Sequence, residues 1–256
     1  MPIDYLPIDD IIAHRGLRLV LVQGVPSPWG QAAKAMAEYK GLEFVCGAQL
    51  PGAANETLVA WAGTNSGPVV AWADEAPLNR WDDILFLFER LGPQRPLIPE
   101  DRALRAHVLG LCHEICGELG LGWNARLAMF RPALESGRAP EGVKAMGAKY
   151  GYREADVARA EERLRASLAM FAGQLAAQRQ RGRRYLVGED VSAVDFYWAA
   201  FCNLLDMPGD DLVPLPAQAR QMFLQIPEAV RGALDPELKA HRDHMLEHYF
   251  RVPMEM

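Results

Sequence analysis

The segment of residues 92–100 (GPQRPLIPE) constrains the fold of this chain most, because it places three prolines within nine residues. Such a composition cannot continue a helix and is typical of a linker. Strand and helix patterns alternate before it, and only helical patterns follow it. We therefore predict a first domain over 1–91 that begins with an N-terminal extension, a linker over 92–100 and an all-helical domain over 101–256.

The first domain alternates short apolar strands with amphipathic helices. The run LRLVLVQGV at 17–25 predicts a buried strand, and residues 28–40 predict a helix with Ser27 as N-cap and Pro28 as first residue. The later segments predict a strand, a helix, a strand, an edge strand and a helix, in the order 42–46, 55–61, 69–73, 77–81 and from Asp82. The predicted order is βαβαββα.

The second domain shows strong helical patterns throughout. They cover roughly 101–121, 122–135, 140–150, 153–180, 192–205, 214–224 and 236–250. Ser192 and Asp195 stand before the apolar run FYWAAFCNLL in the spacing of a capping-box variant, in which a hydroxyl and a carboxylate bond the first turn of the helix.

Charge and composition exclude several classes of protein. The chain has 256 residues, half of them hydrophobic, and a net charge of −6, so nucleic acid is an unsuitable partner. The basic run at 179–184 is interpreted as a solvated turn. The first ten residues are acidic and contain Pro2 and Pro7, unlike a targeting signal, and no apolar run is long enough to cross a membrane. We expect a cytoplasmic protein without a membrane partner.

The four cysteines, Cys46, Cys112, Cys116 and Cys202, contain no CxxC pair, and a reducing compartment would keep them as thiols. Most of them are expected in the core.

Taken together, the βαβαββα order, the linker and the stretch YLVGEDVSAVDFYWAA resemble the glutathione transferase superfamily over nearly the whole chain. Tyr185, Leu186, Gly188, Ser192 and Asp195 match the motif that opens a buried helix of that family's second domain. The resemblance implies a thioredoxin-like first domain, with a cis-proline at Pro68 between Gly67 and Val69. It also implies that the backbone of Gly67 pairs with the cysteinyl part of glutathione.

The turn Ser27-Pro28-Trp29 lies between the first strand and the first helix, and it resembles the active-site turn of several glutathione transferase classes. The positive end of a helix and a hydroxyl donor can together hold a thiolate. In this chemistry the thiol of glutathione is the nucleophile. Two interpretations of Ser27 remain open: a helix cap alone, or a cap that also activates the thiol. Trp29 is expected to line the glutathione site.

The start of the helix that follows Asn79 departs from the family pattern. The usual acid-serine pair, which binds the γ-glutamyl group, falls here on Arg80 and Trp81. Asp82 or Asp83 could replace the acid, and Arg80 could bind a carboxylate with its forked guanidinium. The other interpretation is that both aspartates only favour the helix start.

Cys112, His113, Cys116 and Trp123 fall where the resemblance places the pocket for the electrophilic substrate. Cys112 and Cys116 share one helix face, which is more typical of packing than of a metal site. His241, His244 and His248 also share a face, and zinc is an alternative that needs further ligands. We expect no metal.

The sequence therefore predicts a glutathione-dependent transferase or lyase that acts on a small apolar electrophile, with glutathione as co-substrate. The resemblance implies a homodimer. The alternative is a non-catalytic binding or interaction protein that keeps the fold and has a degenerate glutathione site. Thiol-disulfide exchange is disfavoured, because Ser27 stands where that chemistry needs a cysteine.

Overall fold

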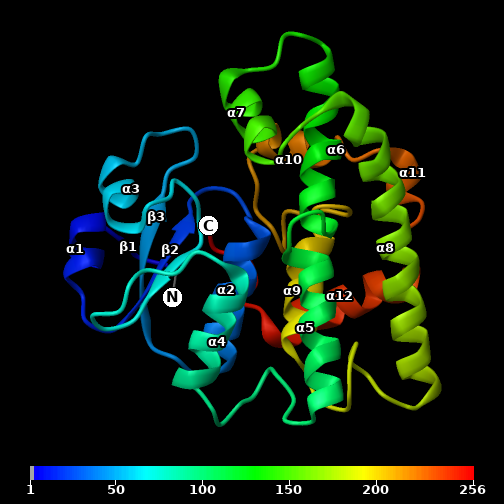
Figure 1. The fold of residues 1–256 in the computed structure, drawn as a ribbon, viewed down its shortest axis with the longest axis horizontal. Helices are drawn as coiled ribbons and strands as arrows, with labels where there is room; N and C mark the ends of the chain where they lie inside the picture. The colour runs from blue at the N-terminus through cyan, green and yellow to red at the C-terminus, as the bar shows by residue number, and fades with distance from the viewer. Residues whose placement is uncertain (1–2) are drawn as a thin grey trace.

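The computed structural model describes residues 3–256, without the side chains of residues 154–156 and 158. Figure 1 shows an α/β domain beside a larger group of helices. The α/β domain contains, in chain order, β1 (Tyr5–Leu6), α1 (Ile8–Ala13), β2 (Leu17–Val22), α2 (Pro28–Tyr39), β3 (Phe44–Gln49), α3 (Glu56–Ala62), β4 (Val69–Ala71) and α4 (Trp81–Leu91).

The four strands form one mixed sheet in the order β1-β3-β2-β4. β3 is parallel to both β1 and β2, and β4 is antiparallel to β2, with Val20 opposite Val69. This register places the start of β4 beside the end of β2. The turn that leads into α2 and the loop that leads into β4 therefore lie at the same edge of the sheet.

Helices cover both faces of the sheet (Figure 1). On one face, Ile11 of α1 and Leu58 of α3 pack on Val20 and Val69. On the other face, α2 and α4 bury apolar side chains such as Met36 and Phe88 in the main core. A sheet that is covered on both faces explains the apolar run over residues 19–22 of β2.

The N-terminal extension adds a strand and a helix that the sequence patterns do not predict. α1 packs directly on β3 at Gly47, where a Cβ atom would lie 2.7 Å from Cγ1 of Ile11. Glycine is required at this position for the close approach of the helix.

The predicted edge strand over 77–81 is wrong. Only Leu78 pairs, through two backbone hydrogen bonds with Val70, and α4 already begins at Trp81. The rest of the predicted order is confirmed within a few residues at each boundary.

The second domain is helical throughout its described residues. Its helices are α5 (Arg102–Cys116), α6 (Leu121–Glu135), α7 (Glu141–Lys149), α8 (Glu154–Gln180), α9 (Ala193–Cys202), α10 (Ala217–Phe223), α11 (Glu228–Arg231) and α12 (Pro236–Tyr249). The predicted helix over 101–121 ends at Cys116 instead, and α11 was not predicted. No helix among the described residues has the length and apolar character that a membrane span requires.

The buried helix α9 forms the centre of the second domain, and all ten of its residues are buried. The predicted capping box at its start is present: the Asp195 carboxylate accepts hydrogen bonds from the backbone N–H and the hydroxyl of Ser192, at 2.9 and 3.0 Å. α2 of the first domain and α5 and α12 of the second pack around this helix (Figure 1).

Candidate active site

Ser27 occupies the N-cap position of α2, and Pro28 is the first helical residue, as predicted. The backbone carbonyl of Ser27 accepts a hydrogen bond from the Gln31 N–H at 2.8 Å. Its side chain, however, makes no capping bond and has no partner among the described residues. The half-buried hydroxyl is thus free to bond a ligand at the positive end of the helix.

The loop before β4 contains the predicted cis-proline. The Gly67–Pro68 peptide bond is cis. A Cβ atom on Gly67 would lie 3.1 Å from the backbone nitrogen of Val22, so the loop packs tightly against the end of β2. The backbone N–H and carbonyl of Gly67 have no backbone partner in the described part of the chain. They lie next to the strand that leads into the Ser27 turn.

At the start of α4, Arg80 is already paired with the two aspartates that follow it. Its guanidinium lies 3.0 Å from Asp82 Oδ2 and 3.6 Å from Asp83 Oδ2. Burial raises the pKa of Asp82, but hydrogen bonding and charge attraction from Arg80 outweigh it, so that the pKa is lowered and Asp82 stays ionised. Its second oxygen, Oδ1, is buried and has no hydrogen-bond partner among the described residues. The side chain as a whole is 29% exposed, so a ligand cation can approach the carboxylate.

Trp29 and Trp81, predicted to contact glutathione, both pack against the second domain. The indole N–H of Trp29 donates to the Cys116 carbonyl at 3.2 Å, and its ring meets Phe201 edge to face at 4.6 Å. Trp81 packs edge to face on Tyr197, whose hydroxyl donates to the Trp81 carbonyl at 3.1 Å. Both indoles therefore join the two domains at the border of the site.

The residues of the predicted substrate pocket lie in different surroundings. Cys112 and Cys116 lie in the main core and are 0% and 5% exposed. Trp123 instead packs edge to face on Tyr150, with ring centroids 5.0 Å apart. The two cysteines thus act as apolar packing residues of α5.

The buried cysteines are expected to be unreactive in the native protein. Burial raises the pKa of Cys46 and of Cys202 to about 12, and the pKa values of Cys112 and Cys116 well above the ordinary range. The thiolate is the reactive form, so at about pH 8 a disulfide reagent should modify none of the four before unfolding and all of them afterwards. A thiol that reacts within seconds in the folded protein would contradict this account.

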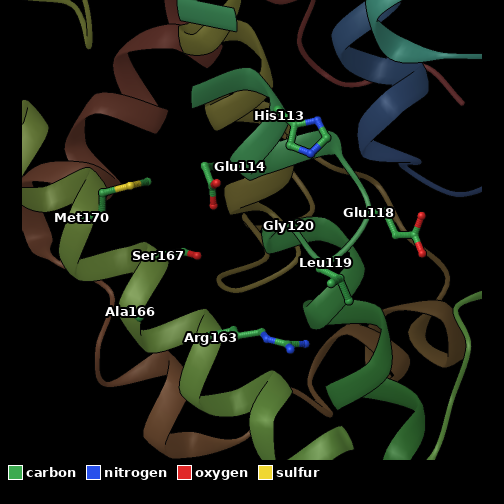
Figure 2. A pocket seen from close by; sticks show the side chains of 9 residues that line it. All are labelled: His113, Glu114, Glu118, Leu119, Gly120, Arg163, Ala166, Ser167 and Met170. Carbon is green, nitrogen blue, oxygen red and sulfur yellow. The ribbon is translucent and has the colours of Figure 1, made fainter. Parts of the chain in front are cut away.

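His113 lines a cavity of about 390 Å³ between the end of α5 and α8 (Figure 2). The walls come from the end of α5, the α5–α6 turn and α8, and they contain Glu114, Glu118, Leu119, Gly120, Arg163, Ala166, Ser167 and Met170. His113 also contacts the Trp81 ring at 6.3 Å. Ser27 and Gly67 do not line this cavity, so it is separate from the turn where the thiol chemistry is predicted.

Sequence reasoning missed a basic and aromatic group beside the Gly67–Pro68 loop. Lys149, at the end of α7, donates from Nζ to Ser66 Oγ at 2.5 Å. Tyr150 stacks on Trp29 with centroids 6.4 Å apart and lies next to the buried Arg126. The only signal in the sequence is that Arg126 is the one charged residue of the otherwise uncharged stretch 121–130.

The three histidines of α12 do not converge on a metal position. His241 is fully buried and its Nε2 lies 2.8 Å from Asp195 Oδ1, whereas His248 Nδ1 bonds the carbonyl of His244. No cluster of three potential metal ligands occurs among the described residues.

Part of the second domain matches a known family. Residues 154–244 match the model of the glutathione S-transferase C-terminal domain. No curated protein matches this sequence.

Solved structures with the same fold cover nearly the whole chain. A glutathione S-transferase of Methylobacterium radiotolerans in complex with glutathione sulfonate shares 20% identity over 88% of this chain and 93% of its own, with a TM-score of 0.54. One of Methylobacillus flagellatus with GSH bound shares 16% over 88% and 98%, with a TM-score of 0.56. One of Rhodospirillum rubrum shares 18% over 93% and 95%, with a TM-score of 0.54. Identities this low establish a shared fold: a thioredoxin-like domain followed by a helical domain.

Proposed function

We propose that this chain, which has the glutathione S-transferase fold and that family's C-terminal domain, is a glutathione-dependent transferase. The observation that carries the proposal is the unused Ser27 hydroxyl at the start of α2. It lies at the same sheet edge as the cis Gly67–Pro68 bond, whose free backbone groups are suited to a peptide ligand. The glutathione complexes of proteins with this fold support the choice of thiol.

In the proposed reaction the glutathione thiol loses its proton to solvent, and the Ser27 hydroxyl donates a hydrogen bond to the thiolate. The α2 dipole favours the same negative charge. The sulfur then forms a bond to the electrophilic carbon, and the bond to the leaving group breaks with its electron pair. Gly67 aligns the cysteinyl backbone of the ligand, and the Asp82 carboxylate accepts a hydrogen bond from the ligand's ammonium group.

Ser27→Ala should lower kcat/KM for an activated aryl halide by about tenfold to a hundredfold, because a donor to the developing charge is lost. The bound thiol then stays protonated to a higher pH. Ser27→Thr, which keeps the hydroxyl, should retain most of the activity. Steady-state rates of the three proteins test this role, and equal rates for wild type and Ser27→Ala would remove Ser27 from the mechanism.

Asp82→Asn should raise the Kd for reduced glutathione about tenfold or more, since a charge-assisted hydrogen bond contributes about 1.5–3 kcal/mol. Asp83→Asn is the matched control, because Asp83 is the next residue and its side chain is 50% exposed. Calorimetric titration of both variants measures the difference. The same loss in both would show that only the charge of the helix start matters.

A second candidate function is that of a non-catalytic binding protein. It is favoured by the pairing of Arg80 with Asp82 and Asp83, and by the packing of Trp81 against Tyr197, where the family pattern has an acid and a serine. Absence of saturable glutathione binding up to millimolar concentration would favour this function over the transferase.

A further inference from the structure

Two basic side chains lie beside the proposed site, and neither has an acidic partner among the described residues. Arg126 of α6 is 8% exposed and stands over the Phe223 ring at 5.8 Å, and Lys149 lies over the Tyr150 ring at 5.8 Å. Neither forms a salt bridge with any residue that the structure describes, and Arg126 Nε has no hydrogen-bond partner there. Both interact with neutral groups of the protein: Tyr150 lies next to Arg126, and Ser66 accepts from Lys149.

Arg126 is buried without a counter-charge, which is unfavourable, and this burial lowers its pKa. Lys149 is exposed at the surface beside it, and partial desolvation together with the nearby Arg126 charge lowers the pKa of Lys149. An anion bound between them would remove this penalty. The pair is therefore suited to a carboxylate or another small anionic group.

The surroundings of the pair indicate which molecule supplies the anion. Tyr150 connects the two cations to Trp29 and Trp123, whose rings lie against it at 6.4 and 5.0 Å. Trp29 is two residues from Ser27, so this aromatic wall borders the position proposed for the thiol. Flat apolar surfaces fit an aromatic or similarly flat body. Glutathione has carboxylates but no such body, so the second substrate is the better match.

We propose that the electrophilic substrate carries an anionic group, bound by Lys149 and Arg126, and a flat apolar body that packs against Trp29 and Trp123. This inference rests on the proposed transferase function and changes the expected substrate class from a neutral apolar electrophile to an acidic one. Lys149 and Arg126 are then the residues that determine specificity, and Ser66 positions the Lys149 ammonium.

Binding of an unreactive probe tests the substrate class without catalysis. We would titrate the full chain, without glutathione, with a dinitrobenzoate that lacks a leaving group and with its neutral carboxamide, and follow tryptophan fluorescence. The benzoate should bind about tenfold or more tightly than the carboxamide, as a charge-assisted contact requires. Equal affinities would overturn the proposal.

Substitutions in α7 test whether the preference for the benzoate comes from Lys149. Lys149→Met should remove the preference for the benzoate and leave carboxamide binding unchanged, and Lys149→Arg should keep the preference. Lys144→Met is the matched control, because Lys144 is on the same helix and is paired at the surface with Glu141. A preference that survives Lys149→Met, or is lost equally in Lys144→Met, would overturn the assignment.

A parallel titration with reduced glutathione separates the two proposals. If Lys149→Met weakens glutathione binding but not benzoate binding, the cations hold a carboxylate of glutathione and the acidic-substrate proposal fails. If the benzoate preference is present but wild-type protein does not bind glutathione, the anion site stands and the transferase function fails.

Discussion

Replacing Asp195 with alanine is expected to lower the free energy of unfolding by about 3–5 kcal/mol, because a buried charged network loses its centre. The carboxylate is fully buried and accepts four bonds. Oδ1 accepts from the Leu186 N–H at 2.9 Å and lies 2.8 Å from His241 Nε2, and Oδ2 accepts from the N–H and hydroxyl of Ser192. The substitution leaves these donors buried without an acceptor.

This network explains why the motif that contains Leu186, Ser192 and Asp195 stabilises the fold. It connects the loop before α9 and the first turn of α9 to the middle of α12, which lies 46 residues further along the chain. Urea unfolding of Asp195→Ala measures the loss. Asp190→Ala, an exposed aspartate of the same loop, is the control and should leave the unfolding midpoint unchanged. Equal midpoints for the two variants would show that the Asp195 network contributes nothing to stability.

Lys40→Met is expected to lower the free energy of unfolding by about 2–4 kcal/mol, since it breaks a buried ion pair whose hydrogen bonds are all made. The Lys40 ammonium donates to the carbonyls of Gly92 and Arg95 at 2.9 and 2.8 Å and lies 2.6 Å from Glu89 Oε1. Glu89 in turn accepts from the N–H groups of Leu97 and Ile98. Together the two side chains fix the proline-rich linker to α2 and α4.

Lys34→Met is the matched control, because Lys34 lies in α2 and Lys40 is the C-cap residue of the same helix. Lys34 is 1% exposed, but its ammonium has no hydrogen-bond partner among the described residues and lies 3.8 Å from Glu255 Oε2. Replacing it with methionine should be neutral or stabilising, because burial of this charge is poorly compensated. Urea unfolding of both variants gives the comparison, and equal destabilisation would contradict the role of the hydrogen bonds at Lys40.

The Lys34 variant also has a predicted pH dependence. Burial lowers the pKa of Lys34 in the folded protein in spite of Glu38 and Glu255, so the unfolded state binds more protons between this lowered pKa and the ordinary value of about 10.4. The free energy of unfolding of the wild type therefore increases as the pH rises through that window, because Lys34 loses its proton in the folded protein. The difference in free energy of unfolding between Lys34→Met and wild type should favour the variant most below the window and decrease as the pH approaches about 10.4.

The order of elements was predictable because local patterns determine it. The β-branched run of β2, the Pro28 start of α2 and the prolines of 92–100 each have one favoured local structure. The strand predicted over 77–81 is only a single bridge at Leu78. A bridge and a short edge strand have similar apolar sequence patterns, so the sequence alone does not distinguish them. α1 depends on a contact with Gly47, a tertiary feature that no local window contains.

The candidate site was predictable only where a motif marks it. Ser27, Gly67 and Pro68 follow from the resemblance, and the structure supplies their conformations: a cap position without a capping bond, and a cis peptide. The pairing of Lys149 with Ser66 was not predictable, because it joins positions 83 residues apart through the packing of α7 over the first domain. The hydrogen bond from the Trp29 indole to the Cys116 carbonyl was not predictable either, because it also joins residues that are distant in sequence.

The most direct test of the central claim is the pKa of the glutathione thiol when it is bound to this protein, read from thiolate absorbance against pH in wild type and Ser27→Ala. We predict that wild type lowers this pKa below the ordinary thiol value of about 8.5, and that Ser27→Ala raises it again by about one unit or more. An identical thiol pKa in the two proteins, or no thiolate signal from a saturated complex, would contradict the proposal that the start of α2 activates glutathione.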